Sequence, residues 1–363
     1  MMSQTTQGVT LLWALRSPCN LNCQYCYFGT LGGPQDRSAG PSYPGELSHV
    51  GCHDLSLFSQ LRWISSFTPA LVHRVFVAGG EPLIWKGTGR VLKALKEAGC
   101  KVIVCTNGLP LRDETVVRSL LEIGVDAVSI SLDSHDAAYH DHWRQDRSGQ
   151  GWLGVVEGVR TLVSLRNAEH HPMKIGIYSV ITQLNIDHIL PTARYVADLG
   201  VDYFIIQPIS LTPDHAHGPD LMLDARHQST LAQALEALQQ AGLSLHLPHP
   251  GYLKRVLQTL MPGPLPVIQQ CFGGRDLFFI EPDGSVWDCP SCYKIAQTPT
   301  NTSLSIRDYS ATELFSVQRR QRNTDCACFS QECVNMWQLM AFDQILAPGG
   351  SYDTIALPAS VAE

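Results

Sequence analysis

The sequence predicts an α/β protein: a partial (β/α)6, TIM-like barrel at residues 1–265, followed by a small cysteine-rich domain at residues 266–363. Up to about Gln207, strand-length apolar segments alternate with amphipathic helical segments. Near-continuous apolar strands separated by helices indicate a parallel sheet with helices on its outer face. From Cys271 onward, cysteines and a predicted hairpin replace this alternation, and little helical periodicity is left.

Six strands and six helices account for the predicted barrel and the segment that leads out of it. The strands are expected at 9–15, 74–78, 101–106, 127–132, 174–181 and 203–207, and the helices at 54–65, 86–98, 113–123, 152–167, 187–199 and 224–241. Gly99, Gly124 and Gly200 stand where a helix must end before the next strand, a position that favours the left-handed conformation of glycine. In such folds ligands gather at the carboxyl ends of the strands.

Composition narrows the classes of protein to consider. The 363 residues are 44% hydrophobic and 16% charged, as in a chain that buries a core, and the formal net charge is −7. A negative chain without a basic run argues against nucleic acid or an anionic membrane as the main partner. Neither a secretion signal nor a 20-residue apolar span is present, so the twelve cysteines predict reduced thiols or metal ligands in the cytoplasm.

Three cysteines, Cys19, Cys23 and Cys26, follow the first predicted strand in the stretch C19-N-L-N-C-Q-Y-C26. Structural zinc sites use two separated pairs and four ligands, and no fourth ligand is close in this sequence. Iron–sulfur clusters are bound by closely spaced thiolates, and three cysteines on a 4Fe–4S cluster leave one iron open to a ligand. Residues 29–51, rich in Gly, Pro and Ser, come next; they are either a lid over this site or a surface insertion.

Four motifs in register resemble those of the radical S-adenosylmethionine (radical SAM) enzymes. Besides the cysteine triplet, they are Ala78-Gly-Gly-Glu-Pro82, T106-N-G108 and S131-L-D133, each at the carboxyl end of a predicted strand. The resemblance implies an enzyme that reductively cleaves SAM to a 5′-deoxyadenosyl radical and abstracts a substrate hydrogen. It also implies a flavodoxin- or ferredoxin-type electron donor.

The same resemblance assigns roles to single residues. Cys19, Cys23 and Cys26 would hold the cluster, and SAM would occupy its open iron. Gly79 and Gly80 would let the backbone approach the methionine moiety, and Glu81 would pair with its ammonium group. Ser131 and Asp133 would contact the ribose, with Asn107 as a further candidate, and Tyr25 would pack against the cluster loop and the adenine.

A second set of cysteines lies near the carboxyl terminus and resembles the auxiliary-cluster domains called SPASM and twitch. Cys271, the hairpin with Gly284, Cys289 and the tail C326-A-C-F-S-Q-E-C333 carry this resemblance, although the tail departs from the full SPASM pattern. It implies one auxiliary 4Fe–4S cluster held by Cys271, Cys289 and two of Cys326, Cys328 and Cys333. Zinc bound by Cys289, Cys292 and the tail is the alternative. The remaining cysteines, Cys52, Cys100 and Cys105, are expected to be buried thiols.

The substrate is expected to be a small molecule, because only 18 residues precede Cys19 and peptide-modifying relatives often carry a leader-binding domain there. The stretches around the triplet, V77-A-G-G-E-P-L-I-W85 and Q207-P-I-S-L-T-P-D-H215, resemble the cytosylglucuronate decarboxylases of nucleoside-antibiotic pathways. This predicts decarboxylation of a sugar nucleoside; epimerisation or crosslinking of a ribosomally made peptide is the alternative. Arg16 and Arg275 are candidate partners for a substrate carboxylate. Rim positions are candidate substrate contacts: Ser179, Thr182, Gln207 and Ser210.

Overall fold

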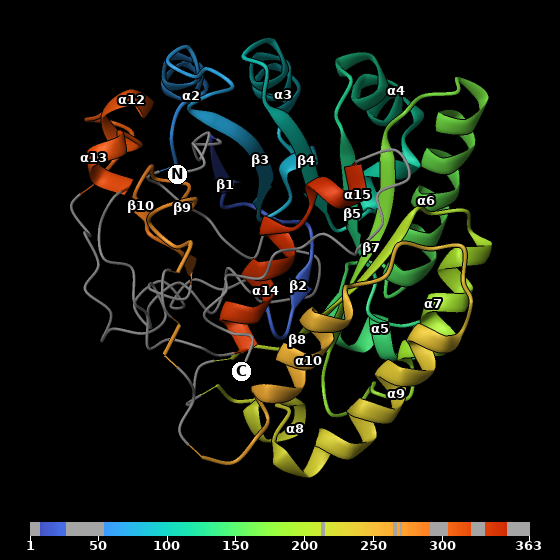
Figure 1. The fold of residues 1–363 in the computed structure, drawn as a ribbon. Coiled ribbons are helices and arrows are strands. Elements are labelled where there is room, and N and C mark those ends of the chain that lie inside the picture. The colour runs from blue at the N-terminus through green and yellow to red at the C-terminus, as the bar shows by residue number, and fades with distance from the viewer. Residues whose placement is uncertain are drawn as a thin grey trace.

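An eight-stranded sheet forms the centre of the molecule, a computed structural model that describes residues 8–26, 54–211, 215–263, 267–268, 271–290, 304–320 and 331–346 (Figure 1). Its order is β10-β9-β1-β3-β4-β5-β7-β8, and the six strands from β1 to β8 in this order run parallel. These are β1 (Val9–Arg16), β3 (Val72–Gly79), β4 (Lys101–Thr106), β5 (Ala127–Ser131), β7 (Lys174–Ile181) and β8 (Tyr203–Pro208). The predicted parallel sheet of a partial barrel is confirmed.

Helices between successive strands form the outer layer of the barrel (Figure 1). They are α2 (Leu57–Ile64), α3 (Thr88–Glu97), α4 (Glu114–Ile123), α6 (Gly151–Ala168) and α7 (Ile189–Asp198). The sequence sets their ends: the Asp113 carboxylate caps α4 by accepting the Thr115 N–H at 2.8 Å, and Gly124 ends it with φ +73°. Gly99 and Gly200 take φ +81° and +83°, as predicted.

Short elements not expected from the sequence lie at the loops that follow the strands. Two of them, β2 (Asn22–Cys23) and β6 (Arg144–Gln145), pair in antiparallel fashion and place Cys23 opposite Arg144. The others around the barrel are η2 (Pro82–Ile84), η3 (Leu109–Arg112), α5 (Ala137–Trp143), α8 (Gly218–Leu221), η4 (Ala225–His227) and α10 (Pro250–Gln258). The predicted helix at 224–241 is present as η4 and α9 (Gln228–Gln240).

The predicted hairpin is present and extends the barrel sheet. Strand β9 (Leu277–Ile280) pairs in parallel with β1, and β10 (Val286–Trp287) returns antiparallel to β9. Gly284 makes the turn with φ +96°, and its N–H donates to the Glu281 carbonyl at 2.9 Å. The hairpin therefore shares a sheet with the barrel, and a domain boundary near residue 265 stays a prediction.

The end of the described chain contains more helix than expected: α12 (Ala311–Leu314), α13 (Val317–Arg320), α14 (Gln331–Met340) and α15 (Asp343–Leu346). Helix α14 lies on the concave side of the sheet, opposite the outer helices (Figure 1). Its residues from Cys333 to Leu339 are all buried. Its polar residues Gln331, Asn335 and Gln338 lie on one face at helical spacing, but they are buried like the apolar ones.

Helix α15 is fixed to the amino-terminal ends of β3 and β4 by an acidic residue. The Asp343 carboxylate lies 3.1 Å from His73 Nε2, 3.0 Å from Arg74 Nη1 and 3.4 Å from Lys101 Nζ. The Arg74 side chain is 2% exposed, so Asp343 balances a buried charge. Next to this contact, the ring of Phe342 packs edge-on against Phe76, with centroids 5.1 Å apart.

Replacing Asp343 by asparagine is expected to lower the free energy of unfolding by about 1–3 kcal/mol, because the buried Arg74 guanidinium loses a charged partner. Burial raises the pKa of Asp343, but the hydrogen bond from His73 and the charge of Arg74 outweigh it and hold this pKa below its usual range. The folded pKa is lower than the unfolded one, so this stabilisation is present above about pH 4 and is lost as the pH falls further.

Urea unfolding at several pH values tests this prediction, with Asp308→Asn as the control because Asp308 is exposed. The difference between wild type and Asp343→Asn should shrink as the pH falls below 4. A difference that is the same at pH 3 and pH 7 would contradict it.

Part of the prediction falls outside the described residues: the loop 29–51 and the cysteines Cys52, Cys292, Cys326 and Cys328.

Candidate functional site

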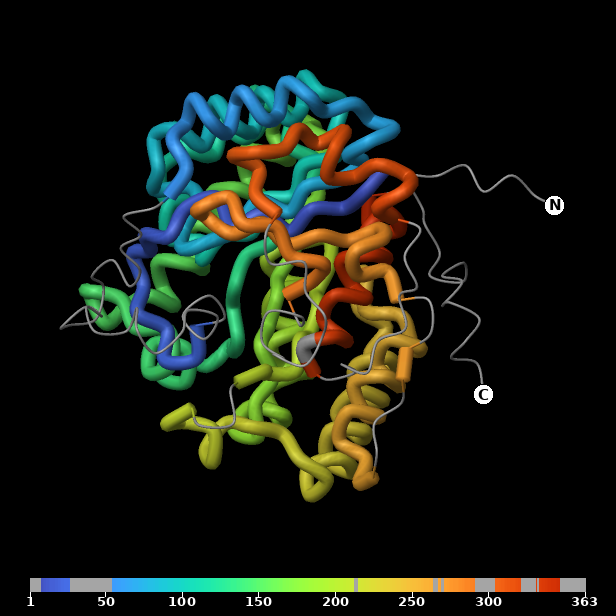
Figure 2. The backbone as a smooth tube through the Cα atoms, turned by 90° about the vertical axis from the view of Figure 1, so that its left-hand side faces the viewer, coloured from blue at the N-terminus to red at the C-terminus, as the bar shows by residue number. Residues whose placement is uncertain are grey.

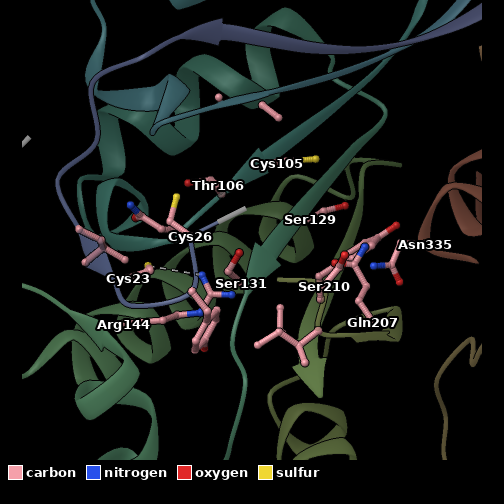
Figure 3. A pocket seen from close by; sticks show the side chains of 18 of the residues that line it. Cys23, Cys26, Cys105, Thr106, Ser129, Ser131, Arg144, Gln207, Ser210 and Asn335 are labelled. Carbon is pink, nitrogen blue, oxygen red and sulfur yellow. Dashed lines mark hydrogen bonds between the residues drawn. The ribbon is translucent and has the colours of Figure 1, made fainter. Parts of the chain in front are cut away.

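A cavity of about 240 Å³ opens at the carboxyl ends of the parallel strands (Figure 3). It is lined by eight of the residues that the sequence motifs single out: Cys19, Cys23, Tyr25, Cys26, Gly79, Gly80, Asn107 and Ser131. Two others, Glu81 and Asp133, are buried and do not line the cavity. The fold thus brings the four motifs together at one place.

The loop that carries the three cysteines is fixed at its base by Asp54. The Asp54 carboxylate accepts hydrogen bonds from Ser17, at 2.9 Å from the backbone N–H and 2.6 Å from the hydroxyl, and pairs with Arg16 Nε at 3.0 Å. Within the loop, the Cys26 N–H donates to the Cys23 carbonyl at 3.2 Å. The backbone therefore holds the thiols in a defined turn above β1.

Burial raises the pKa of two of these thiols, Cys19 and Cys23. Burial first, and then the neighbouring Cys23 and Glu81, raise the pKa of Cys19 well above its usual range. Burial likewise raises the pKa of Cys23 to about 12, although Arg144 opposes the shift. Bound iron would replace the thiol protons, since a coordinating thiol is deprotonated.

The donor set fits a cluster better than a single ion. Among the described residues, no three His, Cys, Asp or Glu side chains form a group that could hold one metal ion. A cube of four irons is wider than one ion and needs thiols spread around a cavity, as Cys19, Cys23 and Cys26 are. The lining holds four thiols, those of the triplet and of Cys105, and no carboxylate, which is also the chemistry that iron–sulfur clusters require.

Gly79 and Gly80 bring the end of β3 against the cysteine loop. The Gly80 N–H donates to the Arg16 carbonyl at 2.8 Å, and a Cβ on Gly80 would lie 2.1 Å from the Pro18 carbonyl oxygen. Gly79 takes φ +131°, a conformation that side chains with a Cβ rarely adopt. Neither position accepts a side chain without moving this loop.

Replacing Gly80 by alanine is therefore expected to displace the loop at Pro18 and to weaken SAM binding about tenfold or more, as overpacking costs roughly 1–3 kcal/mol. Gly89→Ala is the matched control, since the nearest atom to its new Cβ would be 3.8 Å away. Equilibrium binding of SAM to both reconstituted variants measures the effect. Equal affinities would show that the loop tolerates the shift.

Glu81 connects the end of β3 to the end of β4. Its Oε1 accepts from the Leu83 N–H and the Thr106 hydroxyl, both at 2.9 Å, and its Oε2 accepts from the Asn107 N–H at 2.7 Å. Burial raises the pKa of Glu81 to about 7 against the opposing effect of these hydrogen bonds. Asn107 in turn donates from Nδ2 to Asn20 Oδ1 at 2.6 Å, so this network reaches the cysteine loop.

Asp133 forms a buried ion pair with Arg144, a residue that the sequence motifs did not single out. Arg144 Nη2 lies 3.1 Å from Asp133 Oδ1, its Nε contacts Oδ2, and the Tyr25 hydroxyl donates to the same Oδ2. Burial raises the pKa of Asp133, but the Arg144 guanidinium outweighs it and holds this pKa below its usual range. Both Asp133 oxygens therefore have protein partners, and the predicted contact with the ribose stays a prediction.

Arg144 connects this ion pair to the cysteine triplet. Its Nη1 lies 3.9 Å from Cys23 Sγ (Figure 3). It is also the only charged side chain among the described residues that line the cavity. No sequence signal marks Arg144, because its place depends on the pairing of β6 with β2, which two-residue strands do not reveal.

Cys271 and Cys289 are buried close together, since both lie within 4 Å of the position that a Cβ on Gly273 would take. Cys333, on α14, is also buried. Their ligand roles stay a prediction, because Cys326 and Cys328 lie outside the described residues. Cys105, expected to be a buried thiol, is half-buried and lines the cavity (Figure 3).

The two arginines proposed as carboxylate partners are engaged elsewhere. Arg16 pairs with Asp54 and lies over the Trp85 ring at 4.8 Å from its centroid. Arg275 Nε lies 2.7 Å from the Asp276 carboxylate. Neither residue lines the cavity.

Known proteins with similar sequences support the assignment of a family. Residues 18–196 match the model of the Radical SAM superfamily. The chain is 26% identical over 200 residues to AdoMet-dependent heme synthase of Methanosarcina barkeri, covering 55% of this chain and 50% of that protein. It is 28% identical over 290 residues to mycofactocin maturase MftC of Mycolicibacterium smegmatis, covering 78% and 64%. The chain thus spans about half to two thirds of the length of these relatives.

Solved structures show the same fold. The structure of Streptococcus suis SuiB bound to S-adenosylmethionine matches with a TM-score of 0.61 at 14% identity, covering 92% of this chain and 75% of that one. The AdoMet-bound structure of anSMEcpe matches with a TM-score of 0.57 at 17% identity, covering 86% and 78%. In the part of the chain that the structure describes, no helix has the length and apolar character to cross a membrane. Residues 18–196 therefore carry the sequence pattern of the Radical SAM superfamily, and the chain shares its fold with SuiB and anSMEcpe.

Proposed function

We propose that this enzyme binds its cluster through Cys19, Cys23 and Cys26 and abstracts a hydrogen atom from a substrate held in the adjoining cavity. The observation that carries the proposal is that the three thiols, Gly79, Gly80 and Arg144 line one cavity at the carboxyl ends of the strands. When bound, the reduced cluster supplies the electron that splits SAM into methionine and the 5′-deoxyadenosyl radical.

The residues of the chain position SAM and keep water out. Gly79 and Gly80 leave room for its methionine moiety, and Arg144 is the cation available to its carboxylate. The Ser131 hydroxyl lines the cavity and makes no hydrogen bond with the described residues, so it is free for a ribose or carboxylate oxygen. Asp133 acts through Arg144, whose guanidinium it holds in place. Glu81 positions the ends of β3 and β4 and is the candidate partner of the SAM ammonium.

An auxiliary 4Fe–4S cluster in the cysteine-rich region is part of the proposal. Cys271 and Cys289 would be ligands together with two of Cys326, Cys328 and Cys333. Such a cluster would carry electrons between the substrate and a flavodoxin- or ferredoxin-type donor. The proximity of Cys271 to Cys289 supports this ligand set.

For the substrate, the first candidate reaction is decarboxylation of a sugar nucleoside such as cytosylglucuronic acid. Abstraction of the hydrogen next to the carboxylate would let carbon dioxide leave, after which the remaining radical anion takes up one electron and two protons. The sequence likeness at 13–30, 77–85 and 207–215 supports this candidate.

Modification of a ribosomally made peptide is the second candidate, and one observation favours it. In the described cavity Arg144 is the only cation, so a uronate carboxylate and the SAM carboxylate would compete for it. A peptide backbone is uncharged and needs no such partner. One matching structure holds Streptococcus suis SuiB with its precursor peptide SuiA, so a protein with this fold can bind a peptide.

Anaerobic reconstitution followed by SAM and dithionite tests the radical chemistry, which predicts 5′-deoxyadenosine. Its absence from a protein with a full complement of iron would reject the proposal. Incubation with cytosylglucuronic acid should then give a product lighter by carbon dioxide. SAM cleavage beside unchanged substrate would reject the decarboxylase and leave the peptide candidate. A gene for a short precursor peptide next to the gene of this protein would support that candidate.

A further inference from the structure

Two carboxamide side chains lie on the wall of the cavity away from the cysteines. Gln207 comes from the end of β8, and Asn335 comes from α14. In Figure 3 they gather with Ser210 on one side, whereas Cys23, Cys26 and Arg144 lie on the other. The barrel and the carboxyl-terminal helix therefore build this part of the wall together.

The orientation of Asn335 is fixed by the protein, yet it keeps hydrogen-bonding capacity. Its Nδ2 donates to the Pro208 carbonyl at 3.2 Å, and its Oδ1 lies 3.4 Å from the Tyr252 hydroxyl. The Tyr252 hydroxyl makes its shorter bond, 2.8 Å, to the Ile206 carbonyl. A carboxamide has two N–H donors and an oxygen with two lone pairs, so one N–H and one lone pair of Asn335 stay open.

The Gln207 side chain has even more hydrogen-bonding capacity available for a ligand. Its side chain is half-buried, lines the cavity and makes no hydrogen bond with any described residue. A half-buried amide without protein partners is ready to bind a ligand, because its donor and acceptor are already partly removed from water. The neighbouring surface is apolar, with Ile209, Met336 and Leu339.

This side of the cavity also lacks charge. No charged side chain of the described lining lies here, since Arg144 is the only one and is paired with Asp133 on the cysteine side. A carboxylate or phosphate on this side would lose its hydration without gaining a cation. A neutral group with an N–H beside a C=O would instead match the two carboxamides, as Asn and Gln match the edges of nucleobases.

We propose that Gln207 and Asn335 form a recognition subsite for the uncharged, amide-like edge of the substrate, where a donor stands next to an acceptor. The inference rests on the proposed function, because it places the substrate in the cavity beside SAM. Nucleobases and peptide bonds share this chemistry, and the subsite fixes that end of the substrate so that its reacting carbon faces the cysteine side.

The test is calorimetric binding to the anaerobically reconstituted enzyme with SAM present. The probes are cytidine, N-acetylalanine methylamide and glucuronate, and the variants are Gln207→Leu and, as the matched control, Gln233→Leu on the exposed face of α9. At least one neutral probe should bind, and Gln207→Leu should weaken it roughly 2- to 10-fold, the value of one neutral hydrogen bond. Gln233→Leu should leave it unchanged, and glucuronate should bind at least tenfold more weakly.

The three probes and the two variants distinguish the possible results. Binding of cytidine alone would identify a nucleobase, and binding of the blocked amide alone a peptide bond; both support the subsite. Tighter binding of glucuronate, no binding of either neutral probe, or equal effects of the two Leu variants would overturn it. SAM cleavage without substrate is measured in parallel: its loss in wild type rejects the proposed function, and Gln233→Leu is expected to retain it.

Discussion

Replacing Cys19, Cys23 and Cys26 together by alanine is expected to reduce SAM cleavage to background. The three thiols are the cluster ligands in our proposal, and without them the cysteine loop presents no thiol to the cavity. Iron and sulfide content should fall by the amount of one 4Fe–4S cluster, and any iron that stays would measure the auxiliary cluster. Both are read from elemental analysis and from 5′-deoxyadenosine formed under dithionite.

Cys100→Ala is the matched control for this variant. Cys100 is a buried thiol whose Sγ donates to the Val72 carbonyl at 3.4 Å, away from the cavity. It should keep both the iron content and the SAM cleavage of wild type. SAM cleavage by the triple-alanine protein above the level without enzyme would refute the assignment of the cluster ligands.

Replacing Arg144 by methionine is expected to lower the free energy of unfolding by about 3–5 kcal/mol, because Asp133 is then buried without its charged partner. SAM binding should weaken as well, since Arg144 is the cation on the described cavity wall. Arg118→Met is the control: its partners Glu114 and Glu169 are exposed with it, so about 0–1 kcal/mol is expected.

The double variant Asp133→Asn with Arg144→Met separates the two roles of the arginine. Without either charge, most of the lost stability should return, whereas SAM affinity should stay low. Chemical unfolding gives the stability, and equilibrium binding gives the SAM affinity. Both are measured on wild type, Arg144→Met, Arg118→Met and the double variant. Full recovery of SAM affinity in the double variant would show that Arg144 acts only on stability.

The barrel was predictable because its strands are apolar runs and its helices end at glycines, which the sequence shows directly. Strand β1 is apolar and buried along nearly its whole length, and the glycines at 99, 124 and 200 mark helix ends by their backbone conformation. Helix α14 was not predicted; its polar residues Gln331, Asn335 and Gln338 are buried among contacts that only the tertiary fold provides. The partnership of β9 with β1 was equally hidden, since nothing local specifies a strand neighbour so far along the chain.

Site residues were predictable from the sequence where they belong to a motif whose chemistry requires that residue type. The cysteine triplet, Gly79 and Gly80 are recognisable from spacing, and the fold places them on one cavity. Glu81 and Asp133 were predicted to face a ligand, but in the structure their oxygens accept hydrogen bonds from the protein. Arg144 and Asn335 reach the cavity only through tertiary contacts, and a linear motif cannot express these.

The pairing of β1 with β9 has a consequence for how the chain is made. During synthesis β1 leaves the ribosome long before its partner on one side, Leu277–Ile280. Until then an apolar strand has an open edge, which invites pairing with other chains. Contacts between distant parts of a chain also form slowly. Production of this enzyme should therefore depend on chaperones that shield nascent chains, and slower translation at low temperature should raise its soluble yield.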